Sequence, residues 1–209
     1  MGASTQIPAR AANPLLEPSQ LPYGVVPFDR LQPSDYENAV REGIKQHIQE
    51  IDAITSNPES PTFENTIVAL DRSGSTLTIA QLALSNVEHA TGDTVLMRIT
   101  SELTPGLTRH STDIMLNEKL WQRVKEVYNN RASRTDLTPE DQRLIELTYK
   151  SFEESGANLS AEAREKYRKL TAELSNLNIR FAQNVTNGMK DPERRMWLTL
   201  DQLEGMPQS

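Results

Sequence analysis

Residues 34–54 read SDYENAVREGIKQHIQEIDAI, and the spacing of apolar residues in this stretch decides the fold class. Ser34 and Glu37 match the capping-box pattern, in which each residue satisfies a free backbone amide of the other, so a helix is predicted to begin at Ser34. Asn57 and Pro58 should end it. The apolar residues that follow Ser34 recur at intervals of four or three, which is one face of an α-helix: Tyr36, Val40, Ile44, Ile48 and Ile51.

A second helix is predicted from Thr62, as its cap, to Ala90. Gly74 falls inside it, and a glycine within a helix costs about 1 kcal/mol relative to alanine. Close approach of a neighbouring helix would offset this cost. The helix carries a heptad pattern with one intermediate residue: Phe63, Ile67, Leu70, Leu77 and Leu84.

A third helix is predicted to begin at a cap provided by Asp93. Pro105 lies within its apolar pattern, so we expect a kink or break near residues 101–104. The residues expected on its buried side are Val95, Leu96, Ile99, Leu103 and Leu107.

Three more helices should begin at Asn117, at Thr138 with Pro139, and at Ser160. Gly156 is a suitable C-terminal residue for the helix that begins at Thr138. The apolar residues of the first two are Leu120, Trp121, Val124, Val127 and Tyr128, then Leu144, Ile145, Leu147 and Phe152. The last helix, which Gly188 should end, carries the longest apolar row: Ala163, Tyr167, Leu170, Leu174, Leu177, Phe181 and Val185.

These patterns predict an all-α protein, an antiparallel bundle of about six helices joined by short loops. Residues 1–33 contain half of the 12 prolines and should form an extended arm, with residues 13–33 lying along the body. Residues 34–188 form the helical domain. Residues 189–209 look like the truncated start of a next segment, with a short strand at 196–200 that lacks a partner strand. The arm residues expected to pack are Leu15, Leu16, Tyr23, Val25, Val26 and Phe28.

Charge and composition exclude several classes of partner. The net charge is −7, which argues against a nucleic-acid surface and against binding to an anionic membrane. The chain has no cysteine, so disulfides and thiol catalysis are excluded. No segment is long and apolar enough to span a membrane. We expect a cytoplasmic protein, or a periplasmic one from which a signal peptide was removed.

No residue pattern predicts a catalytic, cofactor or metal site in this chain. A helical zinc site needs two histidines one turn apart, whereas His47, His89 and His110 are isolated from one another. Each is expected at the surface or in a satisfied core position. Ser73 should lie inside a helix, where a strained nucleophile turn cannot form. The acidic pairs Glu153 with Glu154, and Glu64 with Asp71, are expected to be solvated charges.

Several longer stretches are more specific than these patterns. In chain order they resemble the opening region of bacterial peptidyl-dipeptidases, which belong to the thimet-oligopeptidase family of zinc metallopeptidases. The stretches are Asn13–Leu16, Val26–Asp29, Glu50–Ile54, Asn57–Glu59, Pro61–Ile67, Leu70–Gly74, Thr148–Phe152, Ser155–Leu159 and Gln202–Pro207.

The resemblance implies an almost entirely helical parent enzyme with a deep channel between two lobes. One zinc ion, held by a His-Glu-x-x-His motif and a later glutamate, would activate water to hydrolyse short peptides, releasing dipeptides from their C-terminus. No residue of this chain matches that motif, so the 209 residues alone should not be catalytic. Their partners would be the missing C-terminal catalytic domain and short peptide substrates, with these helices forming part of a channel wall that restricts access.

The alternative is a stand-alone helical interaction module. Its partner helices would bind the apolar rows of the second and last predicted helices. An internal core of the bundle is the favoured interpretation of both rows.

Overall fold

The computed structural model describes residues 12–190, 193, 198 and 199, and α-helices make up most of this part. The all-α prediction is confirmed, and no strand occurs within the described ranges. The predicted strand at 196–200 falls largely outside them, as does the tip of the arm, residues 1–11. The helices are α1 (Pro33–Ser56), α2 (Ala69–Arg72), α3 (Ser75–Thr91), α4 (Thr94–Met115), α5 (Glu118–Asn130), α6 (Pro139–Glu154) and α7 (Ala161–Lys190).

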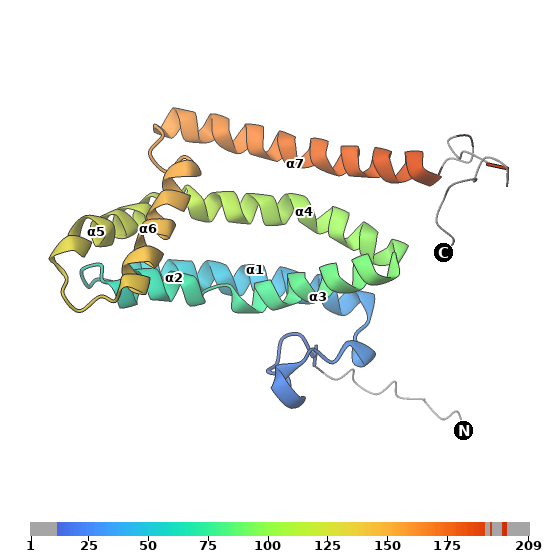
Figure 1. Cartoon of the computed structure of the whole chain (residues 1–209), viewed down its shortest axis with the longest axis horizontal. Coiled ribbons are helices and arrows are strands. Elements are labelled where there is room, and N and C mark those ends of the chain that lie inside the picture. Colours follow the sequence, from blue (N-terminus) through green and yellow to red (C-terminus); the bar gives the residue numbers. More distant parts are fainter. Residues whose placement is uncertain (1–11, 191–192, 194–197, 200–209) are drawn as a thin grey trace, which may run out of the picture.

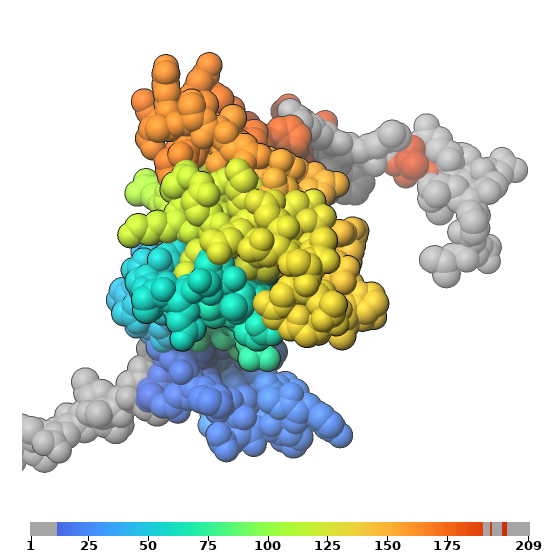
Figure 2. Space-filling model, turned by 90° about the vertical axis from the view of Figure 1, so that its left-hand side faces the viewer, coloured from blue at the N-terminus to red at the C-terminus, as the bar shows by residue number. Residues whose placement is uncertain are grey.

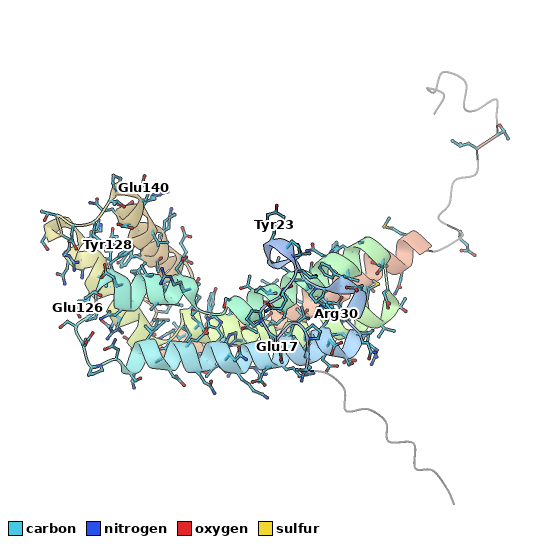
Figure 3. The ribbon with its side chains drawn as sticks, turned by 90° about the horizontal axis from the view of Figure 1, so that it is seen from below. Glu17, Tyr23, Arg30, Glu126, Tyr128 and Glu140 are labelled. Carbon is cyan, nitrogen blue, oxygen red and sulfur yellow. The ribbon has the colours of Figure 1, made fainter. Side chains whose placement is uncertain are left out.

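Four long helices lie alongside one another and alternate in direction, as Figure 1 shows for α1, α3, α4 and α7. The space-filling view shows the same order as a stack: the N-terminal arm, then α1 with α3, then α4, and α7 outermost (Figure 2). Helices α5 and α6 gather at one end of the stack. Seen from below, they project away from the long helices (Figure 3).

The N-cap of helix α1 lies two residues earlier than its sequence pattern suggests. Its N-cap is Gln32, with Pro33 at the first helical position, so the prediction of a cap at Ser34 is wrong. Asp35 replaces Glu37 in the reciprocal contact, because its Oδ2 accepts a hydrogen bond from the backbone N–H of Gln32 at 2.8 Å. Proline is favoured at this position because its missing N–H would have no helical partner.

The second predicted helix is broken at Gly74, so the prediction of one continuous helix is wrong. A π-helical stretch, Phe63–Val68, leads into α2, and α3 begins only at Ser75. Gly74 has a φ of 69°, the left-handed region in which glycine carries no penalty. The expected close approach is present, since a Cβ on Gly74 would lie 2.7 Å from Nδ1 of the His47 ring on α1.

A kink or a break was predicted near residues 101–104, and because α4 is continuous through Pro105, no break occurs. The ribbon of α4 instead changes direction along its length (Figure 1). The predicted cap is confirmed, because Oδ1 of Asp93 accepts hydrogen bonds from the backbone N–H groups of Val95 and Leu96. Val95 itself is exposed, unlike Leu96, Ile99 and Leu103.

The predicted starts of the next helices are confirmed by their hydrogen bonds. Asn117 accepts from the backbone N–H of Leu120, and Thr138 forms a reciprocal capping box with Asp141. Ser160 accepts from the N–H of Ala163 at the start of α7. These caps depend only on neighbouring residues, which explains why local sequence identified them.

The core consists of two apolar clusters that succeed one another along α1. The first joins the N-terminal half of α1 to α3 and α4, through residues such as Val40, Leu84 and Leu103. The second joins the C-terminal end of α1 to the π-helical stretch, α5 and α6, through residues such as Ile67 and Phe152. Ile48 and Leu147, both predicted to be buried, are nearly half exposed.

Helix α7 packs on α4 but does not enter either cluster. The apolar row that its sequence predicts as core is exposed over most of its length, and that prediction is therefore wrong for this helix. The exposed apolar residues of α7 are Leu170, Leu174, Leu177, Phe181, Val185 and Met189.

The arm contacts the body at only some of the residues predicted to pack. Leu15 is buried in the first cluster, and Leu16 and Val26 pack against it. Asn13 ties this segment to α1, because its Nδ2 donates to the backbone oxygen of Asp35 at 2.9 Å. Tyr23, Val25 and Phe28 are exposed instead, and Figure 3 shows Tyr23 pointing away from the body. Short 3-10 turns, Pro22–Gly24 and Phe28–Arg30, interrupt the extended backbone.

Candidate functional site

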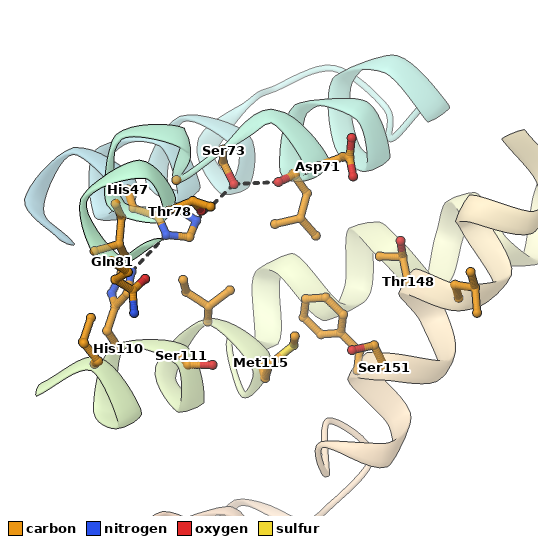
Figure 4. Close-up of a pocket in the computed structure, with 17 residues that line it drawn as sticks. His47, Asp71, Ser73, Thr78, Gln81, His110, Ser111, Met115, Thr148 and Ser151 are labelled. Atoms are coloured by element: carbon orange, nitrogen blue, oxygen red, sulfur yellow. Dashed lines mark hydrogen bonds between the residues drawn. The ribbon is translucent and has the colours of Figure 1, made fainter. Parts of the chain in front are cut away.

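A cavity of about 570 Å³ opens between α3, α4 and α6, beside the break at Gly74. Its apolar walls include Leu77, Leu107 and Met115. Hydroxyl and amide groups line the rest, supplied by Ser73, Thr78, Gln81, Ser111, Thr148 and Ser151, together with the carboxylate of Asp71 (Figure 4). Apolar walls with a few hydrogen-bonding groups are the usual composition of a ligand pocket.

Two of the three histidines, expected to be isolated, meet at one end of this cavity. Nε2 of His110 lies 3.0 Å from Nδ1 of His47, with the two rings edge to face at a centroid distance of 4.9 Å. Nε2 of His47 lies 3.1 Å from Oγ of Ser73. The dashed lines in Figure 4 show this chain of contacts. Helices α1 and α4 therefore join the α2–α3 turn through polar side chains.

The direction of these hydrogen bonds follows from Ser73. Its hydroxyl donates to the backbone oxygen of Leu70 at 2.7 Å, so its oxygen is left to accept from Nε2–H of His47. Neutral His47 then has an acceptor at Nδ1, to which His110 donates its Nε2–H. In this arrangement His47 is a donor to Ser73 and not its base, so Ser73 is not activated as a nucleophile.

Burial favours the neutral form of both rings. Desolvation lowers the pKa of His47, and the nearby carboxylate of Glu50 opposes this only in part. Desolvation also lowers the pKa of His110, with a further lowering from His47 and an opposing effect of Asp113. A charge on one ring would disfavour a charge on the other, because the rings are in contact.

Glu50 also holds the turn that carries Ser73. Its Oε2 accepts a hydrogen bond from the backbone N–H of Gly74 at 2.6 Å. Gly74 is therefore held from two sides, by the Glu50 carboxylate and by the His47 ring against its Cα. Because that N–H is occupied, it is not available to stabilise a developing oxyanion.

The residues at this cavity do not fit a zinc site. Zinc in proteins takes at least three protein ligands, and the facing nitrogens of His47 and His110 are hydrogen-bonded to each other or to Ser73. Across the described ranges, no group of three or more histidine, cysteine, aspartate or glutamate side chains is placed to hold a metal ion.

The other candidate residues lie apart from one another. His89 is exposed on α3, and its Nδ1 lies 2.7 Å from the backbone oxygen of Ser85. Glu153 accepts from Asn158, and Glu154 lies 3.6 Å from Lys150 at the surface. Glu64 is exposed, so only Asp71 of the predicted acidic pairs borders the cavity.

Ser73 was predicted to lie inside a helix, and the structure places it in the turn between α2 and α3 instead. No local pattern could have joined His47 to His110, because 63 residues separate them. A usable signal was their position within each helix. On both α1 and α4 the histidine lies at a helical spacing of three and four residues from apolar residues, between Ile44 and Ile51 and between Leu107 and Ile114.

Comparison of the sequence with known proteins identifies its relatives. No family model matches the chain. By direct comparison, the chain is homologous over most of its length to the N-terminal region of thimet-oligopeptidase-like peptidases.

Three of these relatives are bacterial. A dipeptidyl carboxypeptidase of Salmonella typhimurium is 33% identical over 86% of this chain, and one of Escherichia coli is 35% identical over 83%. Oligopeptidase A of Haemophilus influenzae is 28% identical over 95%. The chain spans only about a quarter of their own lengths: 26%, 25% and 28% respectively. Among the described helices, none is long and apolar enough to cross a membrane.

Proposed function

We propose that this chain is the N-terminal, substrate-access portion of a zinc metallopeptidase that hydrolyses short peptides by releasing C-terminal dipeptides. The observation that carries the proposal is its similarity to two dipeptidyl carboxypeptidases, at 33% and 35% identity over most of the chain. The zinc ion and its ligands would lie in the remaining part of the enzyme, so the chain alone would be inactive.

Within that enzyme, the cavity beside His47 and His110 would form part of the wall of a peptide channel. Its chemistry supports this role. Thr78, Gln81, Thr148 and Ser151 offer neutral hydrogen-bonding groups suited to a peptide backbone, and apolar surface lies between them. With Asp71 as the carboxylate on its border, the cavity would accept peptides without demanding a charged side chain.

A chimaera tests the proposal. In the Salmonella typhimurium dipeptidyl carboxypeptidase, the matched region would be replaced by this chain, and hydrolysis of a blocked tetrapeptide would be followed. We expect zinc-dependent release of C-terminal dipeptides by the chimaera, and neither bound zinc nor cleavage with the 209-residue chain alone. Stoichiometric zinc with cleavage by the isolated chain would contradict the proposal.

The channel-wall role has its own test in the same chimaera. Thr148→Trp would place a larger side chain in the wall of the cavity, and we expect a several-fold higher KM with little change in kcat. Lys150→Trp is the matched control, since Lys150 is exposed on the same helix and does not line the cavity. Equal KM values for the two variants would place the cavity outside the path of the peptide.

One observation favours a second candidate, a stand-alone interaction module: the exposed apolar face of α7. Sedimentation of the isolated chain with candidate helical peptides would test it.

A further inference from the structure

Helix α7 presents a continuous apolar surface to solvent. We call it the α7 stripe, and its six residues are between 45% and 78% exposed: Leu170, Leu174, Leu177, Phe181, Val185 and Met189. Their spacing of three or four residues places them on one side of the helix. Single exposed apolar residues are ordinary, but a contiguous row of this kind marks a surface that another molecule covers.

The stripe is not a core face that has merely rotated outward. Polar contacts fix a neighbouring face of α7 on α4. Nε of Arg168 lies 3.2 Å from Oδ1 of Asp113, and Oγ of Ser175 lies 3.0 Å from Oγ1 of Thr108. Arg164 of α7 also forms an ion pair with Glu118, the first residue of α5. Successive residues of a helix point about 100° apart, so Leu174 cannot face α4 while Ser175 does.

The rest of this chain does not cover the stripe either. Figure 2 shows α7 as the outermost layer of the stack, with α4 between it and the pair α1 and α3. Both apolar clusters lie on the far side of α4 and contain no α7 residue. The described part of the chain therefore leaves the stripe without an apolar partner.

We propose that the α7 stripe is the docking surface for the part of the peptidase polypeptide that lies outside these 209 residues. This inference rests on the proposed function. The chain spans 26% and 25% of two dipeptidyl carboxypeptidases, so about three quarters of such an enzyme would have to pack against it. That portion supplies a permanent partner.

The composition of the surface fits a permanent contact. The stripe contains leucine, phenylalanine, valine and methionine and no charged residue, whereas Lys166, Glu173 and Arg180 on the other faces of α7 are exposed. An apolar centre bordered by charges is the anatomy of a stable protein interface.

The chain contains no cysteine, so a single introduced thiol reports on the stripe. Leu177→Cys would be made in the isolated chain and in the chimaera described above. Its rate of modification by a water-soluble thiol reagent would be read from the mass of the α7 peptide. Lys169→Cys is the matched control, exposed on another face of the same helix. Circular dichroism would confirm that each variant is helical.

We expect Cys at position 177 to react rapidly in the isolated chain and at least about tenfold more slowly in the chimaera, while position 169 changes much less. Equal rates at position 177 in both proteins would overturn the proposal. Protection in the isolated chain that disappears on dilution would also overturn it, because a second copy of the chain would then be the partner. The peptidase activity of the chimaera separates the two proposals. If the chimaera is active but Cys at position 177 still reacts rapidly, only the docking proposal is refuted. If the chimaera is inactive but Cys at position 177 is protected, only the proposed function is refuted.

Discussion

Nε2 of His110 donates a hydrogen bond to Nδ1 of His47 across 3.0 Å, and this contact lies between the two apolar clusters. On α1 the first cluster ends near Ile44 and the second begins at Ile51, with His47 between them. Gly74 likewise lies between Leu70, which packs against the second cluster, and Leu77, which belongs to the first. A polar layer thus divides the hydrophobic interior at the level where the second predicted helix breaks.

The stability of the chain should fall as the pH drops below about 6.5, the ordinary pKa of histidine. The pKa values of His47 and His110 are lowered in the folded state, so between their folded pKa values and 6.5 the unfolded chain binds more protons. The contribution is complete above pH 6.5 and is lost as the pH falls through the folded values. Urea unfolding at pH 7.5 and 5.5 measures it.

The control for this pH dependence is the double variant His47→Gln, His110→Gln, which cannot titrate at these positions. We expect its unfolding midpoint to change less between the two pH values than that of the unaltered chain. An identical change in both proteins would assign the pH dependence to other groups.

Gly74→Ala should destabilise the fold by more than about 1 kcal/mol, because alanine is strained in the left-handed region and its Cβ would meet the His47 ring. Gly92→Ala isolates the strain, since Gly92 has a φ of 62° with nothing within 4 Å of its Cβ position. Gly106→Ala, inside α4 with open space around it, should be neutral or stabilising. Thermal unfolding ranks the three, and equal losses for Gly74 and Gly92 would remove the His47 contact from the explanation.

Arg123 is a buried cation on α5 that holds the loop before the π-helical stretch. Its guanidinium donates to the backbone oxygens of Asn57 and Glu59 and to Oδ1 of Asn65, at 3.0 to 3.2 Å. Arg123→Met would leave these acceptors without their donor, and we expect a loss of about 2–4 kcal/mol in the free energy of unfolding. Arg98→Met, at an exposed ion pair with Glu102, should change it by less than about 1 kcal/mol.

Leu84 and Leu174 both belong to apolar rows predicted from sequence, but truncating them to alanine should change the free energy of unfolding by very different amounts. Leu84 is 4% exposed in the first cluster, so Leu84→Ala should cost about 2–5 kcal/mol. Leu174 is 57% exposed in the α7 stripe, and Leu174→Ala should change stability in the isolated chain by less than about 0.5 kcal/mol. Chemical unfolding of both variants measures this, and a large loss at Leu174 would show that the stripe is covered in solution.

The caps at Asp93, Asn117 and Thr138 could be predicted from sequence because a cap is a contact between neighbours in the chain. The break at Gly74 could not, since the apolar row continues across it from Leu70 to Leu77 and periodicity records only which side of the chain is apolar. At the break, Gly74 contacts the His47 ring and its N–H binds Glu50, and both of these residues lie on another helix. The candidate site could not be predicted for the same reason, because it joins residues from five separate helices.

The row on α7 shows a different limit. Its spacing predicted one apolar face, and the structure has that face. Burial, however, depends on what lies opposite, and no pattern within Ala163–Val185 contains that information. The same spacing of apolar residues would occur whether the row packs within the chain or against another polypeptide segment.

The arrangement of α7 also bears on how the chain moves. None of its described side chains is buried, and the hydrogen bonds that join it to α4 include those of Ser175 with Thr108 and of Arg168 with Asp113. Both hydrophobic clusters would therefore survive if α7 unfolded or detached. The amides of α7 should then exchange with solvent through an opening of this helix alone, at a lower free energy than global unfolding. In the isolated chain we expect α7 to behave as a separate cooperative unit, which a molecule bound to its stripe would stabilise.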